Sequence, residues 1–203
     1  MNEGRRPSIE NQTIAEVGPG TLPVFYIFDN ENFRNIGKDS KYIAIDCNQE
    51  ELDKFIKHFK EEGREAKLGD LENLPLDNDS VDQMWLMNVF GGLESPPKIL
   101  PDGTRQWTLG VQGIFKELAR VVKQNGKIYI GEIYPPKGEV TGLIDKDYTK
   151  FGLEKETYKG PEETESFLKK MGGNNAIIDH MKCDTNKFTP FFVVLTKIKP
   201  QTI

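Results

Sequence analysis

The chain has 203 residues, of which 36% are hydrophobic and 29% are charged, a composition typical of a globular protein with one substantial core. Its net charge of −5 argues against a broad surface for nucleic acid or for anionic membranes. The two cysteines, Cys47 and Cys183, are too few for a disulfide framework and indicate a reducing cytoplasm.

Several other classes of protein are disfavoured by what the sequence lacks. No apolar run is long enough to cross a bilayer, and we expect no contact with a membrane. Residues 1–11 form a polar tail without the apolar core of a signal peptide. The histidines, His58 and His180, lie far apart, which argues against a zinc site. No linker divides the sequence, so we expect residues 1–203 to form a single domain.

A glycine turn follows the first expected strand. Residues 12–17 are apolar enough for a buried strand, and the sequence Gly-Pro-Gly follows at 18–20. Glycine at such a turn allows a backbone to approach a ligand, although a purely structural turn explains it equally well. A helix is expected over 22–35, with Pro23 in its first turn. Pro23 stands where a dinucleotide fingerprint needs its third glycine, which counts against a nicotinamide or flavin dinucleotide.

Strands and helices then alternate along the chain. The further strands are expected at 41–46, 65–68, 81–88 and 127–133, and the further helices at 48–62, 111–123 and 161–171. Two late strands, 176–181 and 191–198, are expected to form an antiparallel hairpin. Such alternation predicts an α/β fold with a mostly parallel sheet, helices on both faces and this hairpin at its C-terminal end.

Polar residues stand at the ends of the expected parallel strands, where ligands of α/β proteins bind. Asp46 can accept hydrogen bonds from two ribose hydroxyls, or it caps the following helix. Asp70 can accept from an adenine amine while the Leu71 amide donates to a ring nitrogen; the alternative is a solvated loop acid. Asn88 ends the fourth strand. Together with the glycine turn, these residues would meet at one rim of the sheet.

Four stretches resemble the motifs of class I S-adenosylmethionine-dependent methyltransferases. They are IAEVGPGT at 14–21, YIAIDCNQEEL at 42–52, LGDLENLPLDNDSVDQMWLMNVF at 68–90 and ELARVVKQNGKIYIGE at 117–132. The resemblance covers roughly residues 12–133. It implies a Rossmann-like fold with a seven-stranded sheet and S-adenosylmethionine as the cofactor. It also implies that the cofactor is bound by Glu16, Gly18, Gly20, Asp46, Asp70, Leu71 and Asn88.

The acceptor of the methyl group is not identified by any motif; it is a small molecule or a protein. The sequence after the fourth strand, Asn88-Val89-Phe90-Gly91, is not the Asn/Asp-Pro-Pro-Tyr motif of enzymes that methylate amino groups of DNA bases. Glu132 and Tyr134, at the end of the fifth strand, are the weak candidates for catalysis, the alternative being packing at the rim. The irregular segments 91–109 and 134–160 are expected to grip the acceptor and cover it.

Two other functions remain open. Leu22 stands where the family usually has a third glycine, which leaves room for a non-catalytic protein that keeps the fold and binds a protein partner. A nucleotide-sugar or NAD-type enzyme is the weaker alternative, and Pro23 is the feature against it. No feature of the sequence determines the oligomeric state.

Overall fold

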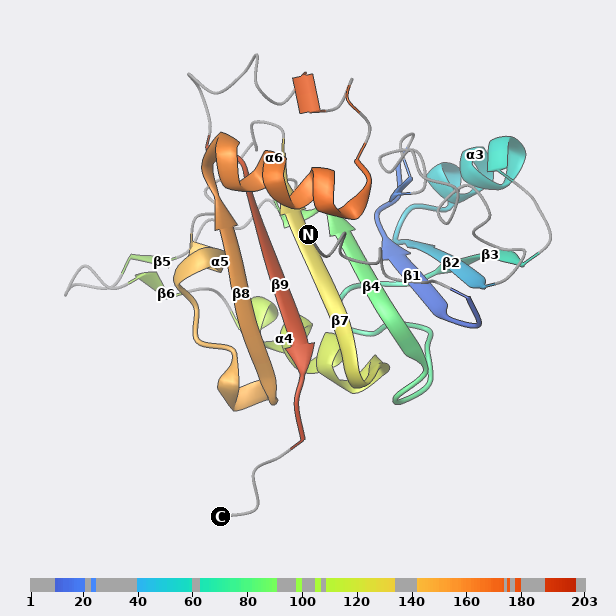
Figure 1. Cartoon of the computed structure of the whole chain (residues 1–203). Helices are drawn as coiled ribbons and strands as arrows, with labels where there is room; N and C mark the ends of the chain where they lie inside the picture. The colour runs from blue at the N-terminus through green and yellow to red at the C-terminus, as the bar shows by residue number, and fades with distance from the viewer. Residues whose placement is uncertain are drawn as a thin grey trace.

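The computed structural model describes residues 10–20, 23–24, 40–59, 63–90, 98–99, 105–106, 109–133, 142–173, 175, 178–179 and 189–199. Seven strands form one sheet with the order β3-β2-β1-β4-β7-β9-β8 (Figure 1). These strands are β1 (Thr13–Val17), β2 (Lys41–Asp46), β3 (Arg64–Leu68), β4 (Val81–Met87), β7 (Val122–Glu132), β8 (Leu153–Lys159) and β9 (Phe191–Lys197). A separate two-stranded ladder joins β5 (Lys98–Ile99) to β6 (Arg105–Gln106).

The direction of the strands confirms the expected fold class. The pairs β1–β2, β2–β3, β1–β4 and β4–β7 are parallel, and β9 runs antiparallel to both of its neighbours, β7 and β8. The described helices are α3 (Gln49–Phe59), α4 (Leu109–Val121), α5 (Gly142–Asp145) and α6 (Gly160–Met171), with a 3₁₀ turn at Thr149–Phe151. Among the described residues, no helix is long and apolar enough to span a membrane.

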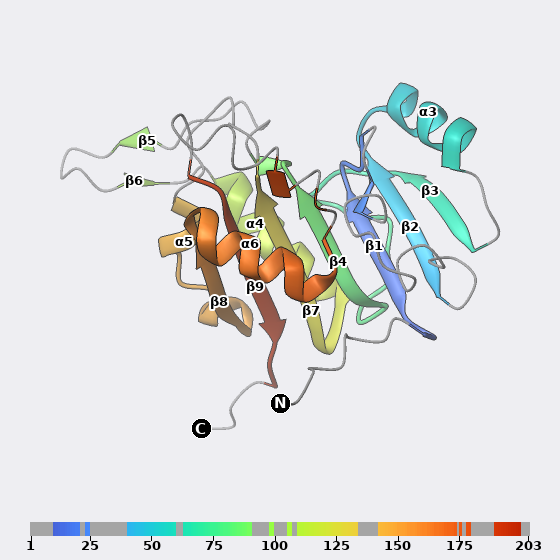
Figure 2. The same ribbon diagram turned by 45° about the horizontal axis from the view of Figure 1, so that its top comes forward.

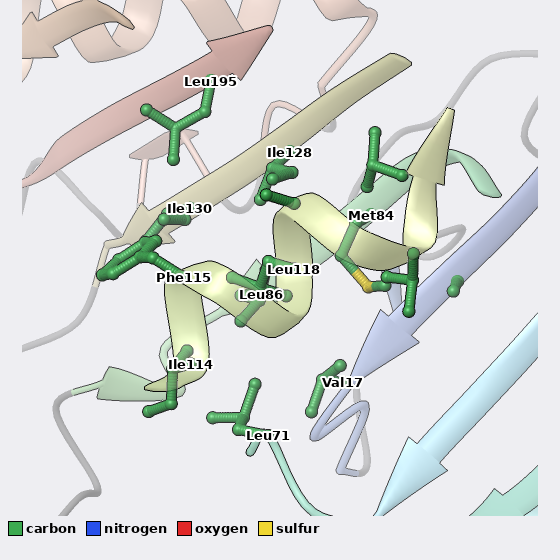
Figure 3. Packing of buried hydrophobic residues seen from close by; sticks show 14 of the residues in the cluster. Val17, Leu71, Met84, Leu86, Ile114, Phe115, Leu118, Ile128, Ile130 and Leu195 are labelled. Atoms are coloured by element: carbon green, nitrogen blue, oxygen red, sulfur yellow. The ribbon is translucent and has the colours of Figure 1, made fainter. Parts of the chain in front are cut away.

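Helices cover both faces of the sheet (Figures 1 and 2). On one face, Phe115 and Leu118 of α4 pack among aliphatic side chains of β4 and β7 (Figure 3). On the other face, Phe55 of α3 and Phe167 of α6 pack near Trp85 and other aromatic side chains. Both faces of the central strands are therefore buried, which explains why β4 is an almost continuous apolar run.

The last part of the sheet differs from the predicted hairpin. β9 pairs with β7 and β8, and α6 lies between β8 and β9 in the chain, so β9 is not joined to an antiparallel partner by a turn. The expected strand 176–181 is wrong, because Ile178 and Asp179 are helical. Part of the expected loop 134–160 is likewise wrong, because it contains β8. Only Leu153 of this edge strand is buried. The other residues of β8 are mostly polar, so the strand lacks the apolar pattern from which a strand is predicted.

Most of the other expected elements are confirmed within a few residues. The helix expected over 22–35 lies outside the described residues, apart from Pro23 and the helical Val24. The segment 91–109, expected to cover the acceptor, is described only at β5, at β6 and at its last residue, where α4 begins.

Candidate cofactor site

A pocket of about 480 Å³ opens where β1, β2, β3 and β4 end. Five residues that the sequence predicts for the cofactor line it: Gly18, Asp46, Asp70, Leu71 and Asn88. The other described lining residues are Val17, Cys47, Gly69, Glu72, Val89 and Ile114. The parallel sheet thus brings together residues that are up to 97 positions apart in the chain, from Val17 to Ile114. This is the rim at which ligands of open α/β sheets bind.

The glycine turn adopts a backbone conformation that favours glycine at both ends. Gly18 has φ of 65° and Gly20 has φ of 51°, in the left-handed region. The Gly18 amide donates to the Ile45 carbonyl at 2.8 Å, which ties the turn to β2. A Cβ on Gly18 would lie 3.2 Å from Val89 Cγ2, so a side chain there would crowd the pocket wall. A Cβ on Gly20 would meet no atom of a described residue within 4 Å.

Glu16 lies beneath the turn, and it is not among the residues that line the pocket. Its side chain is 1% exposed, and its carboxylate accepts the Val24 amide at 3.1 and 2.8 Å. The Tyr42 hydroxyl donates to the same carboxylate. Burial raises the pKa of Glu16 to about 7, against the opposing effect of these hydrogen bonds. Glu16 therefore fixes the position of Val24 after the turn, and direct contact with the cofactor stays a prediction.

Asp46 faces the pocket from the end of β2. Its Oδ1 accepts the Asn48 amide at 2.9 Å, and Asn48 in turn accepts the Glu50 amide at 2.9 Å through its own Oδ1. Asn48 is thus the cap of α3. Among the described residues, no hydrogen bond to Asp46 Oδ2 is present, so this oxygen keeps its capacity to accept from a ligand hydroxyl.

Asp70 and Leu71 form the neighbouring wall. Asp70 Oδ1 accepts the Glu72 amide at 2.8 Å, which shapes a tight turn directly after β3. Leu71 is 8% exposed and packs in the core cluster that includes Val17 and Ile114 (Figure 3). The Leu71 amide donates to no acceptor in the described part of the chain. A fixed donor therefore stands beside a carboxylate in the pocket wall.

The sequence interpretation missed a clamp that holds this wall in place. Glu117 Oε1 accepts the Leu74 amide at 2.8 Å, while Arg120 donates to the carbonyls of Leu74 at 3.2 Å and Leu76 at 2.9 Å. The two side chains also pair at 2.6 Å, and Arg120 lowers the pKa of Glu117. The signal was present in the ELAR stretch at 117–120, because a helix brings its first and fourth residues to one face.

Asn88 and Glu132 form a cross-link between the ends of β4 and β7. Asn88 Oδ1 accepts the Ile133 amide at 2.9 Å, and Glu132 Oε1 accepts the Phe90 amide at 2.9 Å. Glu132 is 1% exposed, so its carboxylate is buried within the protein. It is not among the residues that line this pocket, and a position facing the acceptor stays a prediction. Tyr134, the other candidate, lies outside the described residues.

A second cavity, of about 570 Å³, lies at the opposite end of the strands. Gln12 and Asp82, which precede or begin β1 and β4, line it together with Tyr129 and Phe167. Its distance from the glycine turn along these strands separates it from the candidate cofactor site. In the described residues, no group of three or more His, Cys, Asp or Glu side chains is placed to hold a metal ion.

Comparisons with solved structures show where this fold recurs. A chain of the complex between the Haloferax volcanii Trm112 methyltransferase activator and a putative methyltransferase matches with a TM-score of 0.59 and 16% identity, over 96% of this chain and 86% of that one. An S-adenosylmethionine-dependent methyltransferase from Mesorhizobium loti matches with a TM-score of 0.59 and 12% identity, over 94% and 93% of the chains.

A third structure is the phosphoethanolamine N-methyltransferase 2 of Haemonchus contortus with phosphomonomethylethanolamine and S-adenosylhomocysteine, at a TM-score of 0.58 and 14% identity. It is covered over 50% of its length and this chain over 96%. Identities this low show the fold alone. No curated protein matches the sequence.

The sequence profile described as "Methyltransferase domain" matches residues 16–130, which is more than half of the 203 residues. The match begins in the glycine-turn motif and ends in β7, so it includes every described residue that lines the pocket. The chain belongs to the methyltransferase domain family, that is, to the class I S-adenosylmethionine-dependent methyltransferases that its motifs resemble.

Proposed function

We propose that this protein binds S-adenosylmethionine in the pocket at the ends of β1 to β4 and transfers its methyl group to an acceptor bound beside it. The observation that carries the proposal is the convergence of Gly18, Asp46 and the Leu71 amide on one pocket. Each offers what a different part of the cofactor needs: close backbone approach, an acceptor for ribose hydroxyls, and a donor for the adenine ring.

The pocket fits such a ligand in three respects. It has room for a nucleoside, its Asp46 has one carboxylate oxygen without a described partner, and its Leu71 amide makes no described hydrogen bond. Asp70 adds a carboxylate that can accept from the exocyclic amine of adenine.

S-adenosylmethionine supplies an electrophilic methyl group on a sulfonium, and in-line substitution needs the acceptor held close to that carbon. The contribution of this chain is therefore positional. Asn88 and Glu132 cross-link β4 to β7 and so hold the rim next to the pocket rigid. Because the carboxylate of Glu132 is engaged in this cross-link, we assign it a positioning role and not that of a general base.

Calorimetric titration with S-adenosylhomocysteine tests the proposal. We expect binding in the micromolar range for the wild-type protein and a loss of on the order of 10- to 100-fold for Asp46→Ala, since a hydrogen bond to a charged acceptor contributes about 1.5–3 kcal/mol. Asp53→Ala on the exposed face of α3 is the matched control, because among the described residues this carboxylate bonds only Gln49. The absence of heat for the wild-type protein would overturn the proposed function.

The second candidate function is that of a non-catalytic protein that keeps the fold and engages a protein partner. Two observations favour it: Glu132 is buried in an internal cross-link, and a structure of the same fold was solved in a complex with an activator protein. Methyl transfer with release of S-adenosylhomocysteine distinguishes the two candidates. A protein that binds the cofactor but gives no product with any small-molecule or protein acceptor supports the second.

A further inference from the structure

β3 is the outermost strand at one end of the sheet (Figures 1 and 2). No described strand pairs with its outer edge. Two hydrogen bonds determine which residues of β3 face β2. The Tyr42 amide donates to the Gly63 carbonyl at 2.9 Å, and the Gly69 amide donates to the Asp46 carbonyl at 3.0 Å. A parallel ladder uses every second residue, so the odd-numbered residues turn their backbone toward β2 and the even-numbered ones turn theirs outward.

The outward backbone groups therefore include those of Ala66 and Leu68. Neither residue makes a backbone hydrogen bond outside the β2–β3 ladder to any described residue. An edge of this kind is a template for another strand, and proteins usually protect it. The edge of β3 requires an explanation for this reason.

Exposed apolar side chains gather at the same edge. In the part of the chain that the structure describes, two large hydrophobic side chains are exposed, Ile56 at 39% and Leu68 at 56%. Ile56 belongs to α3, which packs over β3. Between helix and strand lies a groove of about 240 Å³, lined by Phe55, Ile56, Phe59, Arg64, Glu65 and Ala66. The edge therefore presents an exposed apolar side chain, Leu68, and a recess lined by four apolar residues and two charged ones.

We propose that two copies of this chain associate edge to edge through β3, antiparallel, about a two-fold axis at Ala66. In this register Ala66 of each copy exchanges two backbone hydrogen bonds with the other, and Leu68 lies opposite Arg64 of the second copy. Leu68 thus enters the groove that Arg64 lines, and the same contact occurs twice. Such a self-complementary contact is what a two-fold interface requires.

Charge selects this register over its neighbours. With the axis at Ala66, Glu65 lies opposite Lys67 of the second copy, in a pair without backbone hydrogen bonds, where side chains come closest. An axis at Glu65 would place two carboxylates opposite each other, and an axis at Lys67 would do the same with two ammonium groups. Opposite charges directly across antiparallel strands are favourable and like charges are not.

The present partners of the two charged side chains do not prevent this arrangement. Glu65 pairs with Lys41 at 2.9 Å, and both side chains are nearly half exposed. Lys67 donates to the Pro75 carbonyl at 3.3 Å in an exposed contact. Exposed contacts of this kind contribute little to stability, so they can be exchanged for contacts across the axis.

Charge reversal tests the register. Analytical ultracentrifugation of the full chain is expected to show a concentration-dependent species of twice 23.1 kDa. Glu65→Lys and Lys67→Glu should each weaken association roughly tenfold or more, because each creates two like-charge pairs. The double variant Glu65→Lys/Lys67→Glu should recover it. An equimolar mixture of the two single variants should form a mixed dimer, because both of its cross-strand pairs are again opposite in charge.

Backbone pairing has its own readout. Hydrogen exchange at the amides of Ala66 and Leu68 should slow as the wild-type concentration rises, and it should not depend on concentration in Glu65→Lys. Unchanged melting temperatures would show that the variants are folded. A wild-type protein that stays monomeric at high micromolar concentration overturns the proposal, even if the edge accepts a different protein. A dimer that neither charge reversal weakens overturns it as well.

Discussion

The two halves of the sheet's rim use their polar side chains in opposite ways. In the half formed by β1, β2 and β3, Asp46 keeps an oxygen and Leu71 keeps an amide without a described partner, and both face a pocket. In the half formed by β4 and β7, Asn88 and Glu132 use their oxygens to bind backbone amides of the other strand's extension. The first half therefore leaves hydrogen-bonding groups for the proposed ligand, whereas the bonds of the second half join β4 to β7, even though Asn88 also lines the pocket.

This difference separates residues that should affect cofactor binding from residues that should affect stability. The cofactor half should lose affinity on substitution with little loss of fold, and the cross-linked half should do the reverse.

Gly18→Arg should abolish measurable binding of S-adenosylhomocysteine. The substitution places a side chain 3.2 Å or less from Val89 in the pocket wall, at a backbone φ of 65° that costs a non-glycine residue about 1–2 kcal/mol. We expect a loss of affinity of more than about 100-fold, measured by calorimetry. Circular dichroism should show a folded protein, and binding at wild-type affinity would contradict the placement of the cofactor.

Glu16 lies on β1, in the cofactor half, but its side chain stabilises the fold. The stability of the protein should therefore depend on pH through Glu16. Its folded-state pKa of about 7 lies above the value of 4.5 assigned to it when exposed. Its contribution to stability is therefore fully present below about pH 4.5 and is lost as the pH rises through about 7, on the order of 3 kcal/mol in total.

Glu16→Gln removes this titration while its carboxamide can still bond Val24 and Tyr42. Urea unfolding at a series of pH values should show the stability of the variant rising relative to that of the wild-type protein from about pH 5 to about pH 8. If the free energies of unfolding of the two proteins change with pH in the same way, the burial of this carboxylate does not alter its pKa.

Glu132→Ala should reduce stability more than affinity. It leaves the Phe90 amide without its acceptor in a buried place, which costs about 1–3 kcal/mol. Urea unfolding measures this loss, and affinity for S-adenosylhomocysteine should change less than about threefold. Glu132→Gln retains an oxygen that can accept from Phe90, so it should recover the stability. If Glu132→Gln folds normally and still loses methyl transfer, the carboxylate acts in catalysis and our division of the rim is wrong.

The sequence allowed the rim formed by β1 and β2 to be predicted, because both strands are apolar and largely buried. Gly18 directly follows β1 and Asp46 is the last residue of β2, and parallel pairing brings both to one pocket. Asp70 lines the same pocket, but it stands two residues after β3, a polar strand in which no residue is buried. β8 escaped prediction because it is a polar edge strand, and the run at 176–181 misled because apolar β-branched residues also occur in helices. The burial of Glu132 could not be anticipated, because it depends on an amide 42 positions away in sequence.

Arg120→Lys should have the smallest effect on cofactor affinity. It tests whether a residue of α4 supports the wall of the cofactor pocket. Lysine keeps the charge beside Glu117, but its single nitrogen cannot occupy the two positions from which Nη1 and Nη2 of Arg120 bond the carbonyls of Leu76 and Leu74. The wall that carries Leu71 should then loosen. We expect affinity for S-adenosylhomocysteine to fall about three- to tenfold, with about 1 kcal/mol lost in unfolding. Lys116→Ala, on the exposed face of the same helix, is the control. A loss of stability without a loss of affinity would show that the clamp stabilises the fold but does not support cofactor binding.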